Sequence, residues 1–302
     1  MSKLQALRAG ISQDRILKFA GVFDALSARI AEESGLDGVW ISGYGVAAAT
    51  FAKPDIGLTT LTEMADRARN ICRAVGIPVV ADGEVGYGNA LNVARTVEEF
   101  HQAGVVGMQL GDEANETCPY LGLPTQILSE EEAVLKIKAA KAAAGDNDFM
   151  VFSAPQQGID RAVRYAEAGA DAVLFPWENL VGGSPDKDTR DAFQHLHRNG
   201  AIPVAVTAPF LPPVDARELY DLGFRIMVLA VENLYAAAKA QLDLWKAFME
   251  TGTTAGLDHI MITRQEEFMP LVREEEVRRV AREFLPDSFE EIDKRKRFVV
   301  GS

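Results

Sequence analysis

Two acidic residues, Asp82 and Glu84, follow a short apolar segment and precede the glycine-rich stretch Gly86-Tyr87-Gly88. Residues two positions apart on a strand point to the same side, so both carboxylates face one space. Crowded carboxylates repel each other unless a cation lies between them, and the glycines expose backbone N–H groups beside the pair. An all-oxygen ligand set suits Mg²⁺ or Mn²⁺ better than zinc. The pair therefore predicts a metal site, with helix capping as the simpler alternative.

Other polar side chains also come directly after short apolar segments. Asp112 and Glu113 follow one such segment, and we expect them to complete the metal ligands. Asp112 taken alone is equally well explained as a cap of the following helix. Cys118 lies farther along the same polar loop, where a thiol can serve as a general acid, although an ordinary loop cysteine explains it as well.

The elements that must position these residues follow a recurring pattern, in which a glycine is followed closely by a short apolar run. Each glycine suits the residue just after a helix, where a positive φ is needed. Each run is too short for a helix and is apolar on both faces. The runs after Gly35, Gly76, Gly104, Gly169, Gly200 and Gly223, with residues 17–22 and 148–152, predict eight strands. Amphipathic stretches of helical length lie between them, at residues 24–33, 62–75, 90–103, 129–143, 160–168 and 214–222.

The alternation of strands and helices predicts a parallel sheet with crossover helices. Eight units over roughly 230 residues match a closed (β/α)₈ barrel, the TIM barrel, in which the loops after the strands build the active site. A doubly wound open sheet is the alternative fold. We expect residues 1–250 to form the barrel domain. Residues 251–302 are charge-rich and predict a helical extension that packs on the barrel or on a neighbouring subunit.

The bulk composition limits the partners and the compartment. The 302 residues carry a formal net charge of −13, which repels phosphate backbones and argues against nucleic-acid binding. No apolar run has the 18 or so residues needed to cross a bilayer, so no membrane partner is expected. Two cysteines and an N-terminus without a long apolar stretch indicate a soluble, cytoplasmic protein.

Residues 78–93, which read P-V-V-A-D-G-E-V-G-Y-G-N-A-L-N-V, resemble the motif P-V-I-A-D-x-D-x-G-Y-G-N-x-x-N-V of the isocitrate lyase/phosphoenolpyruvate mutase superfamily. Residues 23–28, 42–47, 54–59 and 62–64 are also similar to segments of that superfamily, and the resemblance spans roughly residues 15–245. It implies a Mg²⁺ ion that holds the carboxylate of a 2-oxo or 2-hydroxy acid and stabilises an enolate. It also implies a homo-oligomer, a dimer or a tetramer, with terminal helices exchanged between subunits.

The resemblance assigns roles to particular residues. Asp82 matches the first metal aspartate and Glu84 stands where the second usually is, while Asp55 matches a loop acid near the metal. Asp55, Tyr44 and Cys118 are then the expected catalytic residues, with Tyr44 or Cys118 moving protons. The expected substrate-binding residues are Ser42, Gly43, Tyr44, Gly86, Tyr87, Gly88 and Asn89.

Three departures from the superfamily pattern bear on the substrate. Gly111-Asp112 stands where Glu-Asp is usual, so one acidic ligand is missing and Glu113 is its candidate replacement. The loop of residues 116–120 reads E-T-C-P-Y instead of K-R-C-G-H. Ser153-Ala154-Pro155 stands where an arginine usually pairs with the substrate. The second and third changes remove most of the positive charge that would face the substrate, so we expect a less charged substrate or a loss of activity.

Three functions remain open at this point. The first is a Mg²⁺-dependent lyase that cleaves or decarboxylates a 2-hydroxy or 2-oxo carboxylic acid. The second is a relative that acts on a C–P bond or performs an atypical biosynthetic step, and the missing arginine argues against a phosphonate substrate. The third is a catalytically degenerate barrel with a binding or assembly role.

Overall fold

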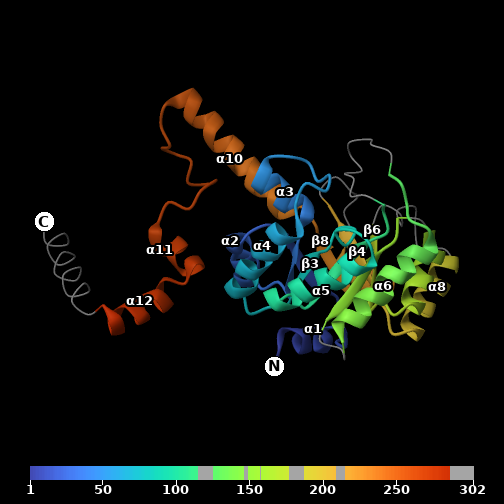
Figure 1. The fold of residues 1–302 in the computed structure, drawn as a ribbon. Coiled ribbons are helices and arrows are strands. Elements are labelled where there is room, and N and C mark those ends of the chain that lie inside the picture. The colour runs from blue at the N-terminus through green and yellow to red at the C-terminus, as the bar shows by residue number, and fades with distance from the viewer. Residues whose placement is uncertain (115–124, 146–148, 157, 177–186, 209–214, 286–302) are drawn as a thin grey trace, which may run out of the picture. The chain divides into compact units, whose positions relative to one another are not determined.

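The computed structural model describes residues 1–114, 125–145, 149–156, 158–176, 187–208 and 215–285 (Figure 1). The chain divides into two compact units, Met1–Ala238 and Lys239–Ser302. The first unit contains the strands and carries the candidate site. The expected boundary between residues 250 and 251 stays a prediction.

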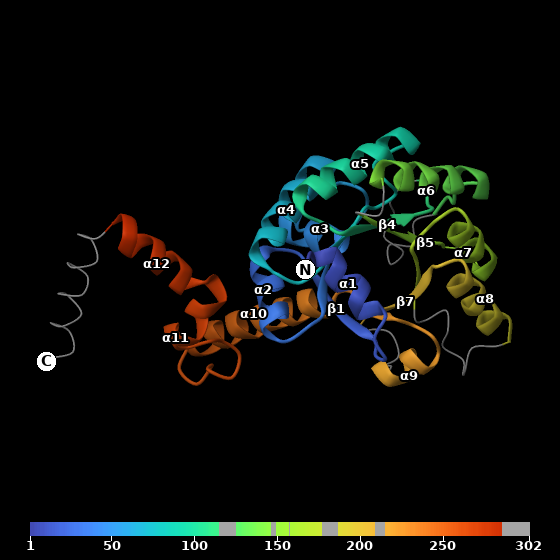
Figure 2. The same ribbon diagram turned by 90° about the horizontal axis from the view of Figure 1, so that it is seen from below.

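Eight parallel strands close into a barrel in the order in which they occur along the chain. This confirms the predicted (β/α)₈ barrel and rules out the open sheet. Figures 1 and 2 show helices of the first unit, such as α2, α4, α5 and α6, arranged around the strands. The strands are β1 Leu17–Val22, β2 Gly38–Ile41, β3 Val79–Asp82, β4 Gly107–Gly111, β5 Met150–Ala154, β6 Ala172–Pro176, β7 Ile202–Thr207 and β8 Ile226–Leu229.

Six helices agree with the expected amphipathic stretches to within about two residues, and three further helices that lie wholly within the described part of the first unit were not among those stretches. The expected ones are α2 Ala25–Glu33, α4 Leu61–Ala74, α5 Ala90–Ala103, α6 Glu130–Ala144, α7 Gly158–Glu167 and α9 Ala216–Asp221. The unexpected ones are α1 Lys3–Ile11, α3 Gly43–Phe51 and α8 Lys187–Arg198. Of these, α3 matters most for function, because it begins directly after β2 with the residues predicted to bind substrate.

The interior of the barrel is filled by large side chains from alternate strand positions. The rings of Phe19, Trp40 and Phe152 meet edge to face at its centre. Gly38 is needed there, because an added Cβ would overlap the Phe19 ring. Leu4 and Leu7 of α1 belong to the same buried cluster, so α1 covers the end of the barrel where the strands begin. Loops occupy the opposite end of the barrel, where the strands finish.

The second unit consists of helices with exposed faces. It contains most of α10 (Glu232–Thr251), then α11 (Gln265–Phe268), the 3-10 turn Met269–Val272 and α12 (Glu274–Phe284). None of these helices has a buried residue, and α12 exposes the apolar side chains of Val277, Val280 and Phe284. Within the described ranges, no helix is both long and apolar enough to cross a membrane.

Candidate metal and substrate site

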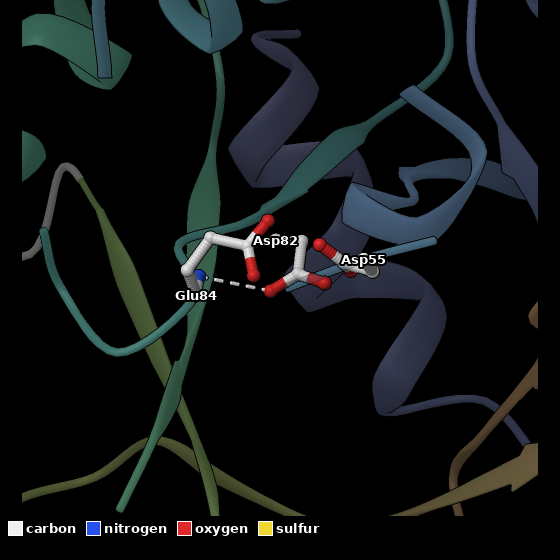
Figure 3. A group of neighbouring side chains, drawn as sticks. All are labelled: Asp55, Asp82 and Glu84. Carbon is white, nitrogen blue, oxygen red and sulfur yellow. Dashed lines mark hydrogen bonds between the residues drawn. The ribbon is translucent and has the colours of Figure 1, made fainter. Parts of the chain in front are cut away.

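Three carboxylates meet where β3 ends. Asp82 is the last residue of β3, Glu84 follows two residues later, and Asp55 comes from the segment between α3 and α4. One oxygen of each carboxylate lies within 4.8 Å of the other two, a spacing that suits one bound cation (Figure 3). The predicted pair Asp82 and Glu84 is therefore joined by Asp55, which was predicted as a catalytic residue near the metal.

Backbone N–H groups fix the orientation of Asp82. Its Oδ1 accepts a hydrogen bond from the Glu84 N–H at 3.0 Å, and its Oδ2 accepts one from the Gly43 N–H at 3.3 Å. Gly43 is the first residue of α3, and the Ser42 side chain caps this helix by accepting from the Gly45 N–H at 3.1 Å. The positive end of the α3 dipole therefore lies beside the acidic group, where it favours negative charge.

The segment after β3 has an uncommon backbone. Glu84 and Tyr87 have φ values of 53° and 56°, and Gly86 and Gly88 have φ values of 87° and 141°. A left-handed conformation costs an L-residue roughly 1–2 kcal/mol. Such strain at a functional loop persists only where the surroundings hold it. Glu84 lies beyond the end of β3 in a left-handed turn, so its side chain reaches Asp82 and Asp55 from this turn and not from the strand position that the sequence predicted (Figure 3).

Burial makes this group unfavourable without a cation. Asp55 is buried, and its Oδ1 has no hydrogen-bond partner among the residues that the structure describes. Burial, and then the charge of Asp82, raises the pKa of Asp55 to about 7. Burial raises the pKa of Asp82 to about 6, against the opposing effect of its two backbone hydrogen bonds. An all-oxygen donor set with an unsatisfied buried carboxylate oxygen fits Mg²⁺ or Mn²⁺.

Asp112 was predicted as a metal ligand, but the structure does not bring it into this group. Its Oδ1 accepts from the Gln156 N–H at 3.0 Å. Its Oδ2 accepts from Arg161 at 2.8 Å and from the Tyr165 hydroxyl at 2.7 Å. Asp112 is buried, so these three bonds to the β5–α7 region satisfy a carboxylate that would otherwise be costly to bury. The geometry gives Asp112 a structural role that ties β4 to α7.

Glu113 is buried next to Gly111. An added Cβ on Gly111 would overlap Glu113 Oε2, so the Glu113 carboxylate occupies the space that a side chain at position 111 would fill. Burial raises the pKa of Glu113 to about 7; the charges of Asp112 and Asp82 act in the same direction, and Lys136 opposes them. Glu113 is not part of the group formed by Asp55, Asp82 and Glu84, so its role as the replacement for the acidic residue missing at position 111 stays a prediction.

The residues expected to bind substrate belong to two segments next to the acidic group, the start of α3 and the loop after β3. Ser42, Gly43 and Tyr44 form the start of α3, and the Tyr44 hydroxyl lies 3.5 Å from that of Tyr235. Asn89 caps α5, with its Oδ1 accepting from the Leu91 N–H at 2.9 Å. A cavity of about 770 Å³ lies beside this loop; the residues predicted to bind substrate or metal that line it are Glu84, Tyr87, Gly88 and Asn89.

Two features escaped the sequence reasoning, and one predicted residue lies outside the described part. Cys118 falls within residues 115–124, which the structure does not describe.

Lys136 of α6 is buried and donates from Nζ to the Val85 carbonyl at 2.9 Å. Thr59 is buried at the cavity with its Oγ1 lacking a hydrogen-bond partner among the described residues. Lys136 had a detectable signal, because it occupies the apolar face of its helix with Ala133, Ile137 and Ala140.

Comparison with known proteins places the chain among enzymes of one family. The sequence pattern of the phosphoenolpyruvate phosphomutase family matches residues 7–249. The 2,3-dimethylmalate lyase of Eubacterium barkeri is 35% identical over 295 residues, which cover 93% of this chain and 97% of that protein. The oxaloacetate decarboxylase of Rhodopseudomonas palustris (strain BisB18) is 34% identical over 254 residues, which cover 82% of this chain and 85% of that protein.

Solved structures agree with these sequence matches. The phosphoenolpyruvate phosphomutase from Streptomyces platensis subsp. rosaceus superposes with a TM-score of 0.83 at 29% identity, over 93% of this chain and 99% of that chain. The chain is also similar to a phosphonopyruvate hydrolase in complex with oxalate and Mg²⁺, with a TM-score of 0.78 at 26% identity, over 94% of this chain and all of that chain. The chain therefore belongs to the phosphoenolpyruvate mutase family, within the isocitrate lyase/phosphoenolpyruvate mutase superfamily.

Proposed function

We propose that this protein is a Mg²⁺-dependent lyase that cleaves a C–C bond in, or decarboxylates, a 2-hydroxy or 2-oxo carboxylic acid. The observation that carries the proposal is the Asp55, Asp82 and Glu84 group, in which a buried carboxylate oxygen of Asp55 lacks a partner among the described residues. The 2,3-dimethylmalate lyase and oxaloacetate decarboxylase relatives support this reaction class.

Asp82 and Glu84 would hold the metal, with Asp55 and Glu113 as further oxygen ligands, either directly or through water. Mn²⁺ suits the same donors. When bound, the cation offsets the negative charge that develops on the substrate oxygen as the enolate forms. Asp112 is left out of this ligand set, because both of its oxygens already accept hydrogen bonds from Gln156, Arg161 and Tyr165.

The start of α3 would bind the substrate carboxylate. Ser42, Gly43 and Tyr44 bring a hydroxyl group and the positive end of a helix dipole to the edge of the acidic group. The Gly86–Asn89 loop would close the other side of the substrate, next to the cavity. The ends of β2 and β3 would therefore bring a cation site and an anion site together, as a small 2-oxo or 2-hydroxy acid requires.

Proton transfer would fall to Tyr44 or to Cys118. The Tyr44 side chain is half-buried, and its hydroxyl lies 3.5 Å from that of Tyr235 in α10, which would serve as its proton relay. The single variants Cys118→Ser and Tyr44→Phe separate the two candidates. The variant that lacks the proton donor should lose turnover and keep Mg²⁺ binding, whereas the other should keep both. Cys72 carries a buried free thiol in the second half of α4, so Cys72→Ser is the matched control.

Calorimetric titration with Mg²⁺ in the presence and absence of oxalate tests the proposal. We expect each ligand to strengthen the binding of the other in the native protein and neither to bind tightly to Asp82→Ala. A panel of 2-hydroxy and 2-oxo acids, including 2,3-dimethylmalate and oxaloacetate, should then reveal a Mg²⁺-dependent cleavage product by NMR. Unchanged turnover and Mg²⁺ dependence in Asp82→Ala would show the proposal to be wrong. With phosphonopyruvate, we expect no new phosphorus resonance.

We also propose that the protein acts as a homo-oligomer, a dimer or a tetramer, in the cytoplasm. The support is α12, which has 11 residues and exposes Val277, Val280 and Phe284 along one side. A helix this short is marginal in water unless its apolar face packs against something, and we infer that the same face of a second copy covers it. Light scattering on Val280→Glu/Phe284→Glu tests this, since the double variant should have a lower mass than the native protein.

A further inference from the structure

The left-handed segment after β3 is held from several sides. The Gly111 N–H donates to the Glu84 carbonyl at 2.8 Å, and the Gly86 N–H donates to the Gly83 carbonyl at 2.8 Å. The Thr96 hydroxyl donates to the Gly86 carbonyl at 3.3 Å. These bonds fix the peptides on both sides of Val85. The Val85 carbonyl lies between the two left-handed residues Glu84 and Gly86, and its partner is the ammonium group of Lys136.

Lys136 is unusual in its burial. Only 4% of its surface is exposed, and no other lysine or arginine among the described residues is buried to this degree. A buried ammonium group is costly unless it is paired and hydrogen-bonded. Lys136 meets this condition through the Val85 carbonyl at 2.9 Å and through electrostatic attraction to Glu132 and Glu113. The Lys136 ammonium group, which has several N–H donors, thus lies next to the loop that carries Glu84.

The position of Lys136 links two parts of the acidic site. Its hydrogen bond restrains the peptide next to Glu84, whose carboxylate faces Asp82 and Asp55 (Figure 3). Its charge attracts Glu113, which occupies the space beside Gly111. One side chain therefore restrains the backbone on the β3 side and attracts an acidic side chain on the β4 side. A methionine would fill the same volume but could do neither.

We propose that Lys136 is a positioning residue that holds the Glu84 loop and Glu113 in their metal-binding arrangement. This inference rests on the proposed function in one respect, namely that the acidic group binds Mg²⁺. Lys136 itself need not touch the metal or the substrate. Outer groups that orient metal ligands typically change metal affinity about 10–100-fold when they are removed. Lys136 should behave in the same way.

The test compares Lys136→Met with Lys136→Arg and with Lys138→Met. Lys138 is exposed on the same helix, so its substitution makes the same chemical change away from the site. We expect Lys136→Met to weaken Mg²⁺ binding in the presence of oxalate by at least about 10-fold, in the range for outer-shell groups. Lys136→Arg should recover most of this loss, and Lys138→Met should match the native protein. Equal affinity of Lys136→Met and the native protein would overturn the inference.

A second measurement does not need the metal. Amide hydrogen exchange at residues 84–88 in the metal-free protein should be clearly faster in Lys136→Met than in the native protein and unchanged in Lys138→Met. If the native protein fails to bind Mg²⁺, the proposed function is wrong, yet this exchange measurement still decides the role of Lys136. If Lys136→Met does not fold, Lys136→Gln replaces it, and equal exchange in Lys136→Gln and Lys136→Arg would contradict the role of the charge.

Discussion

The carboxylate of Glu84 lies in space that Gly43 leaves open. An added Cβ on Gly43 would overlap Glu84 Oε1 and stand 3.0 Å from Asp82 Oδ2. Glutamate is one methylene longer than the aspartate usual at position 84 in the superfamily, so its carboxylate reaches farther across the mouth of the barrel. The first residue of α3 and the second acidic residue after β3 are therefore sterically coupled, although 41 positions separate them.

Gly43→Ala should weaken Mg²⁺ binding by displacing the Glu84 carboxylate. Gly43 is the first residue of α3 and is not among the residues with positive φ, so its backbone accepts alanine and the effect isolates the side-chain overlap. We expect at least about a 10-fold loss of affinity, comparable with other outer-shell changes, and a parallel loss of turnover. Calorimetry with Mg²⁺ and oxalate measures the first effect.

The double variant Gly43→Ala/Glu84→Asp provides the control for this prediction. The shorter aspartate relieves the overlap, so the double variant should bind Mg²⁺ more tightly than Gly43→Ala alone. If the loss of Mg²⁺ binding free energy in the double variant equalled the sum of the losses in Gly43→Ala and Glu84→Asp, the two residues would not interact, and the steric coupling would be wrong.

The stability of the metal-free protein should fall as the pH rises. The pKa of Asp55 is raised to about 7, that of Asp82 to about 6 and that of Glu113 to about 7, whereas unfolded carboxyl groups titrate near 4. Between about pH 4 and pH 7 the folded protein therefore binds more protons than the unfolded chain. The stability that these three carboxyl groups contribute is fully present below their pKa values in the unfolded chain. It is lost as the pH rises through their pKa values in the folded protein.

Thermal unfolding in EDTA from pH 5 to pH 8 measures this dependence. The melting temperature should decline across that window, and excess Mg²⁺ should restore it most strongly at pH 8, where protons no longer compete for the carboxylates. Asp55→Asn/Glu113→Gln should flatten the decline in EDTA. A melting temperature that rises from pH 5 to pH 8 in EDTA would contradict the assigned direction of the pKa shifts.

Much of the barrel could be predicted from local sequence, because each strand and its preceding glycine lie within one short segment. The helix α3 could not. Gly43 and Gly45 are poor helix formers, and the segment reads as a loop. Tertiary contacts favour glycine at both positions, since a Cβ on Gly43 would overlap Glu84 and one on Gly45 would make a tight contact with Phe23 Cβ at 3.1 Å. These contacts join residues that are far apart in the sequence, so a local sequence pattern cannot predict them.

The same limit applies within the acidic site. Asp82 and Glu84 are close in sequence, so their pairing could be predicted, whereas the separation of Asp112 from Glu113 could not. Neighbouring residues on an extended chain point to opposite sides, so Asp112 and Glu113 cannot both turn toward the same group. The choice is made by Arg161 and Tyr165 of α7, about 50 residues away, whose hydrogen bonds hold Asp112.

Asp112→Ala should therefore destabilise the fold. It removes the acceptor for Arg161 and Tyr165 and leaves a largely buried guanidinium without its carboxylate. Breaking such a pair costs about 3 kcal/mol of the free energy of unfolding. Asp221→Ala is the control, because its ion pair with Arg217 is exposed and its loss should cost less than about 1 kcal/mol. Urea unfolding measures both, and a stability of Asp112→Ala close to native would contradict this role.

Variants at Gly111 and Glu113 test whether Glu113 replaces the acidic metal ligand that is missing at position 111. A side chain at position 111 would overlap Glu113 Oε2, so Gly111→Ala should displace that carboxylate and lower the affinity for Mg²⁺ several-fold, as Glu113→Ala should. Gly111→Glu alone should also bind poorly, because two carboxylates then compete for one space. Gly111→Glu/Glu113→Ala returns a single carboxylate to that space from the position that is usual in the superfamily. Its Mg²⁺ affinity should exceed that of either single variant, and calorimetry showing the double variant to be the weakest of the three would mean that Glu113 does not replace the missing acidic ligand.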